Sequence, residues 1–368
     1  MTHKFLDSEQ IFSEINQFNQ QLADSYRTLQ SLSECEVGQS PKQCIYQEDK
    51  LRLYKYQPAD NNKDNNKDNN KDNNDNCQTP LLICYALVNR PYMLDLDPQR
   101  SFINRLTDTG IPVYLIDWGY PDAADRYLDM DDYINGYLHN CVEQVKQHSK
   151  QPQVNLLGIC QGGCLSLSYT ALQPDNIKNL ITMVTPVDFH TQGNMLSHLI
   201  QQIDVDLMVE TLGNIPGQML NDAYAALMPM RLSLQKYLNM PAQCSTEQQA
   251  LNYLRMEKWI NDSPDQAGEM FREFVSQFFR NNGFMNDTAS INGQAIVLQK
   301  IQQPILNIYG QHDHLVPPAA SQALKGLTKS KDYQELEVKS GHIGVFVSQK
   351  SQQIVAPAVS QWLVDHDN

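Results

Sequence analysis

The chain has 368 residues, enough for one large α/β domain with an insertion or for two domains. With 28 basic and 42 acidic residues its formal net charge is −14, which disfavours nucleic acid as a partner. No apolar run approaches the roughly 20 residues that span a bilayer, so no transmembrane segment is expected. The eight cysteines form no CxxC pair, and no histidine pair has metal-ligand spacing. We therefore expect reduced thiols, a cytoplasmic location, no metal and no cofactor.

An apolar seam runs through the N-terminal segment, residues 1–42. Its members recur at alternating steps of four and three residues, with Ser25 in the one gap: Ile11, Ile15, Phe18, Leu22, Leu29 and Leu32. This spacing predicts a long helix. The helix either packs on its own domain or docks another subunit, and both alternatives stay open.

Two short strands are expected within residues 43–58, on either side of a Gln-Glu-Asp turn. A near-perfect NNKD repeat follows from Asn61 to Asp72. Such a tract cannot bury apolar surface, so residues 61–76 are predicted to be a disordered loop without a chemical role.

From residue 80 onward, patterns of buried strands alternate with helical ones. The expected strands are 80–88, 111–119, 153–158 and 179–189, and the expected helices are 98–110, 131–149 and 162–174. Strands that are apolar on both faces and separated by helices predict a mainly parallel sheet covered on both sides. Residues 43–189 would form the first part of this α/β core.

The alternation stops between residues 190 and 296, which are rich in methionine and helix-forming residues. We expect a helical insertion here, either as plain core or as a flexible apolar lid. The α/β pattern resumes in residues 297–368, with strands at 303–313 and 333–341, a helix at 317–327 and a last helix that ends near Trp362.

The strand at 153–158 runs into a cysteine flanked by glycines. The sequence Gly-Ile-Cys-Gln-Gly, residues 158–162, matches the G-x-S-x-G nucleophile elbow of α/β hydrolases, with a thiol in place of the hydroxyl. The start of the following helix favours a thiolate over a thiol. A phosphate-binding loop would require Lys-Ser or Lys-Thr after the glycines, where Cys164 and Leu165 stand. The pattern therefore predicts Cys160 as a nucleophile; a buried structural cysteine is the alternative.

A nucleophile elbow requires an acid and then a histidine later in the chain. Asp313 ends a late strand, and His342 lies between two glycines after the last strand, so these two are the predicted acid and base. The oxyanion hole is expected to use the backbone amide of Gln161 and a second amide from residues 87–89, for which Val88 is our choice.

These motifs resemble those of the short-subunit (class III/IV type) polyhydroxyalkanoate synthases. The matching segments occur in the order of that family: YALVNRPYMLDL (85–96), YLIDWGYP (114–121), LLGICQGG (156–163), RMEKWINDSPDQAGE (255–269), GQHDHLVPP (310–318) and SGHIG (340–344). The resemblance implies the catalytic subunit, with an α/β-hydrolase fold and a helical cap at 190–296. It also implies an acyltransferase that polymerises (R)-3-hydroxyacyl-CoA, typically the 3-hydroxybutyryl ester, with release of CoA.

The same resemblance implies a smaller second synthase subunit, a homodimer or hetero-oligomer, and attachment to the surface of polymer granules in the cytoplasm. Two other functions are possible for this sequence. One is a cysteine-type hydrolase, such as a thioesterase or a dienelactone hydrolase. The other is a non-catalytic, granule-associated interaction protein.

Overall fold

The computed structural model describes residues 8–32, 34–58 and 77–367; the loop predicted at 61–76 lies outside the described residues. The chain divides into two compact units. The smaller comprises residues 1–37 with 221–262, and the larger comprises residues 38–220 with 263–368. Within the described ranges, no helix combines the length and the hydropathy that a membrane span requires.

The larger unit is built on an eight-stranded sheet with the order β1-β2-β4-β3-β5-β6-β9-β10. Its strands are β1 (Lys42–Glu48), β2 (Leu51–Tyr56), β3 (Leu81–Cys84), β4 (Val113–Asp117), β5 (Val154–Ile159), β6 (Ile177–Met183), β9 (Ile305–Gly310) and β10 (Tyr333–Val338). β2 pairs antiparallel with β1 and β4, and the remaining neighbours are parallel. The predicted α/β fold with a mainly parallel sheet is confirmed.

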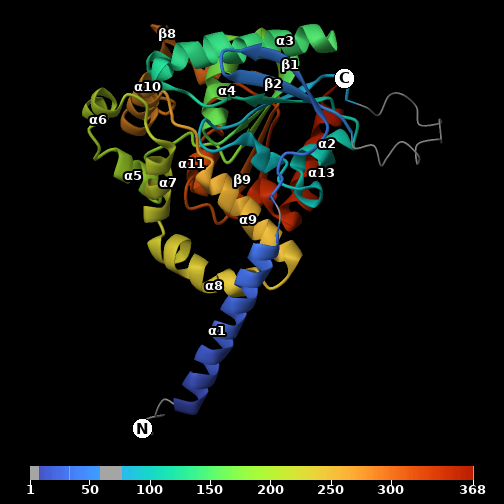
Figure 1. The fold of residues 1–368 in the computed structure, drawn as a ribbon. Helices are drawn as coiled ribbons and strands as arrows, with labels where there is room; N and C mark the ends of the chain where they lie inside the picture. Colours follow the sequence, from blue (N-terminus) through green and yellow to red (C-terminus); the bar gives the residue numbers. More distant parts are fainter. Residues whose placement is uncertain (1–7, 33, 59–76, 368) are drawn as a thin grey trace, which may run out of the picture. The chain divides into compact units, whose positions relative to one another are not determined.

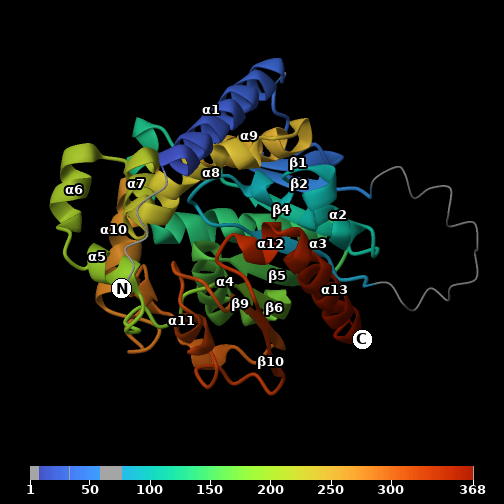
Figure 2. The ribbon, with the colours of Figure 1, turned by 90° about the horizontal axis from the view of Figure 1, so that it is seen from below.

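The centre of the sheet is apolar on both faces because helices cover it from both sides. Every residue of β3 and β5 is buried, whereas the edge strand β10 is largely accessible. Helices α2 and α13 contact each other on one face, and α3 and α4 lie on the other (Figures 1 and 2). All residues of α4 are buried, so the start of this helix is held firmly against the sheet.

The α-helices of the larger unit agree with the predicted pattern apart from their ends. They are α2 (Phe102–Thr107), α3 (His139–Ser149), α4 (Gln161–Leu172), α5 (Met195–Ile200), α6 (Val205–Leu212), α10 (Gly268–Phe274), α11 (Pro318–Gln322), α12 (Gly344–Val347) and α13 (Gln349–Asp365). The helix predicted at 98–110 is split, because the Ser101 hydroxyl accepts a hydrogen bond from the Asn104 amide and caps a new helix. The helix predicted at 131–149 begins with a π-helical segment, η5 (Asp132–Leu138), before α3.

The residues of the predicted insertion, 190–296, are divided between the two units. Helices α5, α6 and α10 belong to the larger unit, α8 and α9 belong to the smaller one, and α7 (Gly217–Ala226) has residues in both. A short antiparallel hairpin that the sequence did not predict, β7 (Ser290–Ile291) with β8 (Gln294–Ala295), follows α10. Met270 is buried, but Met195 and Met219 are exposed, so the methionines are not all core residues.

The smaller unit consists of the predicted long helix and two partners. These are α1 (Ser8–Ser31), α8 (Lys236–Gln243) and α9 (Glu247–Asn261), and α1 contacts both of the others. Ser25 is the one buried residue of α1, and its hydroxyl donates a hydrogen bond to the Pro241 carbonyl at 2.9 Å. The C-terminal half of α1 therefore packs within its own unit.

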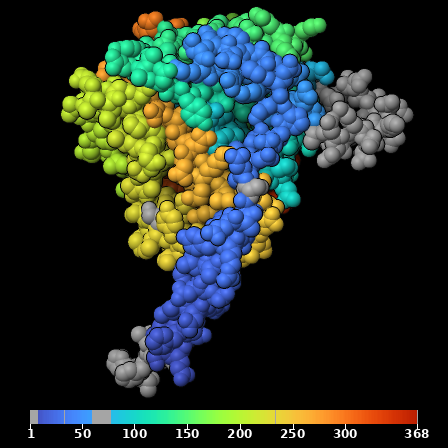
Figure 3. Space-filling view, in the orientation of Figure 1, coloured from blue at the N-terminus to red at the C-terminus, as the bar shows by residue number. Residues whose placement is uncertain are grey.

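The N-terminal half of α1 does not pack in this way. Residues 8–21 are all exposed, including the seam residues Ile11, Ile15 and Phe18. In Figure 3 this part of the helix, in dark blue, extends past α8 and α9. Packing within the unit thus accounts for the C-terminal half of the helix only, and the apolar residues of the N-terminal half are left exposed.

Gly119, after β4, offers a test of how tightly the hairpin β1–β2 packs. It has φ +78°, and a Cβ there would lie 2.3 Å from the Lys50 carbonyl oxygen. Gly326 has φ +88° but nothing within 4 Å of such a Cβ. We expect Gly326→Ala to reduce the free energy of unfolding by about 1–2 kcal/mol, from backbone strain alone, and Gly119→Ala by about 2–5 kcal/mol. Urea denaturation measures both, and equal losses would contradict the predicted clash.

Candidate active site

The sharp turn between β5 and α4 carries Cys160. This residue has φ 55° and ψ −121°, a strained backbone conformation for a residue other than glycine. Its amide donates to the Met183 carbonyl on β6 at 2.9 Å, and its carbonyl accepts from the Gly163 amide at 2.9 Å. These two bonds hold the strained turn, which places the thiol at the C-terminal edge of the sheet and at the start of α4.

The two glycines after Gln161 allow α4 to approach the sheet closely. A Cβ at Gly162 would lie 2.2 Å from the Cys84 carbonyl oxygen, and one at Gly163 would lie 1.9 Å from the Thr185 hydroxyl. Both distances are far below any permitted contact, so only glycine fits here. The sequence pattern of the elbow thus has a steric cause.

The predicted acid and base lie together, although 29 residues separate them in the sequence. His342 Nδ1 is 2.6 Å from Asp313 Oδ2, and both residues are buried. The other carboxylate oxygen of Asp313 accepts hydrogen bonds from the amides of Leu315 and Val316, each at 2.9 Å. The carboxylate is therefore fixed, and it orients the imidazole.

The imidazole in turn interacts with the Cys160 thiol. Burial by itself would lower the pKa of His342, but the negative charges of Asp313 and Cys160, together with hydrogen bonds to both, raise that pKa well above its ordinary value. The structure thus brings Cys160, Asp313 and His342 into the arrangement of a nucleophile, an acid and a base.

The loop after β3, residues 85–90, runs beside this turn and contains Val88. The Leu87 amide donates to Gln161 Oε1 at 3.2 Å. The Trp118 indole donates to the Tyr85 carbonyl at 2.9 Å, which holds the start of the loop. Among the described residues, the backbone amides of Val88 and Gln161 take part in no hydrogen bond. Both are therefore available to a ligand oxygen, as an oxyanion hole requires.

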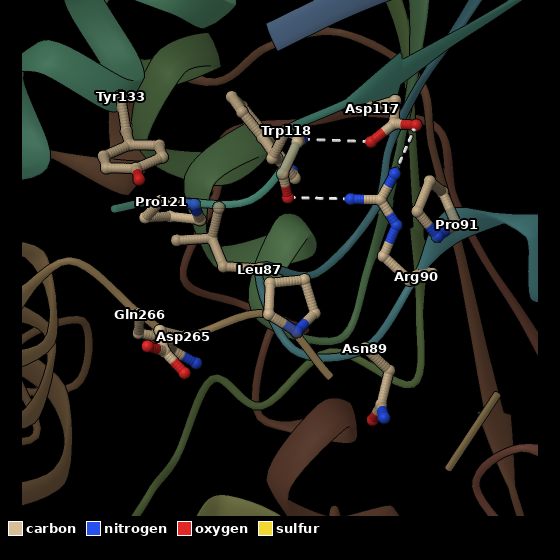
Figure 4. Close-up of a pocket in the computed structure, with 12 residues that line it drawn as sticks. Leu87, Asn89, Arg90, Pro91, Asp117, Trp118, Pro121, Tyr133, Asp265 and Gln266 are labelled. Atoms are coloured by element: carbon tan, nitrogen blue, oxygen red, sulfur yellow. Dashed lines mark hydrogen bonds and ion pairs between the residues drawn. The ribbon is translucent and has the colours of Figure 1, made fainter. Parts of the chain in front are cut away.

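Arg90 holds the far end of the same loop. Its guanidinium donates to Asp117 Oδ2 and to the Gly119 carbonyl, each at 2.7 Å (Figure 4). The guanidinium also lies over the Tyr120 ring, 4.1 Å from the ring centre. The loop therefore connects rigidly to the end of β4.

A recess opens against this loop. Apolar and aromatic residues line it together with polar and charged ones, most of which Figure 4 labels: Leu87, Pro91, Trp118, Pro121, Tyr133 and Pro264, and Asn89, Arg90, Asp117 and Asp265. Gln266 also lines it, and its buried Oε1 has no hydrogen-bond partner. The recess thus offers both apolar surface and polar groups beside the loop.

Comparison with known proteins identifies the family. The model of the alpha/beta hydrolase fold family matches residues 79–349. The poly(3-hydroxyalkanoate) polymerase subunit PhaC of Allochromatium vinosum is 50% identical, with 96% of this chain and 97% of that protein covered. The PhaC subunit of Thiocystis violacea is 48% identical, with 96% of this chain and 97% of that protein covered. The PhaC subunit of Synechocystis sp. is 44% identical, with 96% of this chain and 93% of that protein covered. This chain belongs to the PhaC family.

The family resemblance expected from the motifs is thereby confirmed, and the chain is an enzyme of the acyltransferase class. Among solved structures, the monoacylglycerol lipase of Paleococcus ferrophilus superimposes with a TM-score of 0.50 at 14% identity, covering 86% of this chain and 100% of that one. This likeness shows the α/β-hydrolase fold and nothing further.

Some residues around the site of this PhaC-family chain had no predicted role. The Gln161 side chain contacts an amide 74 positions away, and Arg90 pairs with Asp117 across 27 positions. No periodicity or spacing rule links such positions, since the contact depends on how the loops after β3 and β4 fold back. The motif segments around residues 85–96 and 114–121 were the one available signal.

Cys164 lies one helical turn after Cys160 but has a different environment. It is fully buried, its thiol donates to the Pro186 carbonyl at 3.3 Å, and burial raises its pKa well above the ordinary value. Cys160 is partly accessible. In the ranges 8–32, 34–58 and 77–367, no three His, Cys, Asp or Glu side chains come together as a metal site.

These environments predict selective alkylation. At pH 7 we expect iodoacetamide to modify Cys160 about tenfold or more faster than the exposed Cys44, because the adjacent imidazole of His342 can accept the thiol proton during attack. Cys164 should stay unmodified until the protein unfolds, because it is buried. Peptide mass mapping over time measures all three rates. Labelling of Cys164 at the rate of Cys160 would contradict the assignment of the nucleophile.

Proposed function

We propose that this chain polymerises (R)-3-hydroxyacyl-CoA, typically the 3-hydroxybutyryl ester, and releases CoA through an acyl-enzyme on Cys160. The observation that carries the proposal is the contact of Cys160, His342 and Asp313 in a chain half identical to a named poly(3-hydroxyalkanoate) polymerase subunit along nearly all of its length. The roles below follow from the geometry and charge of these groups.

In the first half-reaction, the Cys160 thiolate attacks the thioester carbonyl of the substrate. A new carbon–sulfur bond forms at Sγ, and the bond to the sulfur of CoA breaks. His342 gives its proton to the departing CoA sulfur. Because one thioester replaces another, the acyl group stays activated for the next transfer. The amides of Gln161 and Val88 would stabilise the tetrahedral oxyanion.

In the second half-reaction, the neutral imidazole of His342 accepts the proton of a 3-hydroxyl group, on a second acyl unit or on the chain end. The hydroxyl oxygen attacks the acyl carbonyl, an ester bond forms, and the bond to Sγ breaks to restore the thiolate. Asp313 keeps the imidazole in the required tautomer and stabilises its charged form. The fixed carboxylate is suited to both tasks.

Water has to be kept from the acyl-enzyme, because hydrolysis would give free hydroxy acid in place of polymer. His342 and Asp313 are only 5% and 6% exposed, which restricts water at the proton-transferring groups.

The proposal is tested with the purified chain and (R)-3-hydroxybutyryl-CoA. We expect CoA release together with turbidity from insoluble polyester. Cys160→Ala should reduce both by more than about 1,000-fold, because the nucleophile is lost, whereas Cys164→Ala should keep most of the activity. A thiol reagent follows CoA, and light scattering follows the polymer. Free 3-hydroxybutyrate without polymer would favour a hydrolase, and intact Cys160 alkylation without CoA release would favour an interaction protein.

We further propose that the exposed half of α1 binds a smaller second synthase subunit and that the enzyme acts in the cytoplasm, at the surface of polymer granules. The relatives are named as polymerase subunits, which supports a partner protein. Ile11 and Ile15 are 37% and 49% exposed, and the seam they belong to continues into the packed half of the helix. At about 1.5–3 kcal/mol for each buried side chain, before association costs, such a seam supports a specific complex but not an obligate one.

Two matched double variants test this surface. Ile11→Glu with Ile15→Glu places two charges in the seam, and Ser13→Glu with Gln17→Glu places two charges at the same spacing on exposed positions outside it. We expect the seam variant to weaken binding of the smaller synthase subunit by tenfold or more and the control variant by less than threefold, since only the seam loses apolar surface. Titration calorimetry measures the Kd. Equal affinities would place the partner elsewhere.

A further inference from the structure

The side chain of Gln161 connects the nucleophile turn to the loop after β3. Gln161 is buried, and its Oε1 accepts the hydrogen bond of the Leu87 amide at 3.2 Å. β3 and β5 are neighbours in the sheet, with Cys84 opposite Gly158. The bond therefore spans the gap between adjacent strands, where the residue after the nucleophile meets the loop that contains Val88.

This bond acts on the middle of a loop whose ends are already held. The Trp118 indole holds the Tyr85 carbonyl, and the Arg90 guanidinium bonds to the end of β4. Between these points Asn89 has φ 58°, a left-handed backbone that turns the chain. Without the Gln161 side chain, the amide of the buried residue Leu87 would lose this hydrogen bond. The middle of the loop would then have no such bond to the nucleophile turn.

The hydrogen bond from Leu87 to Gln161 also makes the amides of Leu87 and Val88 unequal because, in the part of the chain that the structure describes, only the first of them has a partner. Leu87 has its N–H engaged by Gln161, so it cannot serve a reacting oxygen at the same time. The next amide, that of Val88, has no hydrogen bond within the described residues, and neither has the backbone amide of Gln161. One residue thus supplies a free backbone donor and, through its side chain, sets the position of the loop that supplies the other.

We propose that the Gln161 side chain is a positioning residue of the oxyanion hole: it fixes the Val88 amide relative to the Gln161 amide by holding Leu87. The inference rests on the proposed acyl-transfer function. A side chain that merely satisfied a buried amide would affect stability but not the transition state specifically. The two possibilities predict different kinetics, because oxyanion donors act on the tetrahedral state and not on the thiol itself.

Gln161→Met tests the proposal, because methionine keeps the side-chain length but cannot accept this hydrogen bond. The backbone amide of residue 161 is unchanged. We expect single-turnover acylation of the full chain by (R)-3-hydroxybutyryl-CoA to slow about 10- to 100-fold, and kcat to fall with KM within twofold. Alkylation of Cys160 by iodoacetamide involves no oxyanion, so its rate should stay within threefold. Gln173→Met, at the exposed C-terminal end of α4, is the matched control and should change neither rate.

Hydrogen–deuterium exchange of the peptide covering residues 85–90 supplies a readout independent of activity. Exchange should rise in Gln161→Met and return to the wild-type level in Gln161→Glu, whose carboxylate can still accept from Leu87. If the methionine variant fails to fold, Gln161→Ser repeats the test without added bulk.

Acylation at the wild-type rate in the methionine or serine variant, or equal slowing of acylation and alkylation, would overturn the positioning role. Unchanged exchange of the loop would do the same. These outcomes presuppose that the wild-type chain is acylated. A wild-type chain that is alkylated but never acylated would instead refute the proposed function.

Discussion

The strained turn at Cys160 is the constraint on which the site depends. A left-handed backbone at a residue with a side chain costs on the order of 1–3 kcal/mol, so the surrounding structure has to offset it. The offset comes from α4, which is buried along its whole length, and from the hydrogen bond of the Cys160 amide to β6. The glycines that follow the cysteine allow this packing. The sheet and its most buried helix thus hold a reactive thiol in one orientation.

Burial and charge act in opposite directions on the imidazole of His342. In a protein interior without partners the ring would be neutral, but the Asp313 carboxylate and the Cys160 thiolate favour its charged form, and their effect is the larger. The carboxylate can do this because two backbone amides fix one of its oxygens and leave the other for the ring. Asp313 therefore orients the His342 ring, and of Cys160, Asp313 and His342 only Cys160 is partly accessible.

The loop after β3, residues 85–90, is held in place by other contacts than those that hold Cys160, Asp313 and His342. The loop after β3 is tied to the sheet by the Trp118 indole, by the Arg90 guanidinium and by the Gln161 side chain. Leu87, Asn89 and Arg90 of this loop also line the recess. In the proposed reaction, a thiol that exchanges one thioester for another conserves the activation of the acyl group, which favours transfer to a hydroxyl where water is restricted. The loop and the Cys160 turn are held by separate contacts.

The sequence by itself determined the alternation of strands and helices, the elbow at residues 158–162 and the order in which Asp313 and His342 follow it. These features are local, since apolar periodicity, flanking glycines and chain order can be read within a few residues. Only the tertiary structure decided that the Gln161 side chain reaches Leu87, that Arg90 pairs with Asp117, and that one half of α1 packs on α8 and α9 while the other stays exposed. The physical reason is that such contacts join residues far apart in the chain, where loop conformation and side-chain direction, rather than any repeating pattern, determine which groups meet.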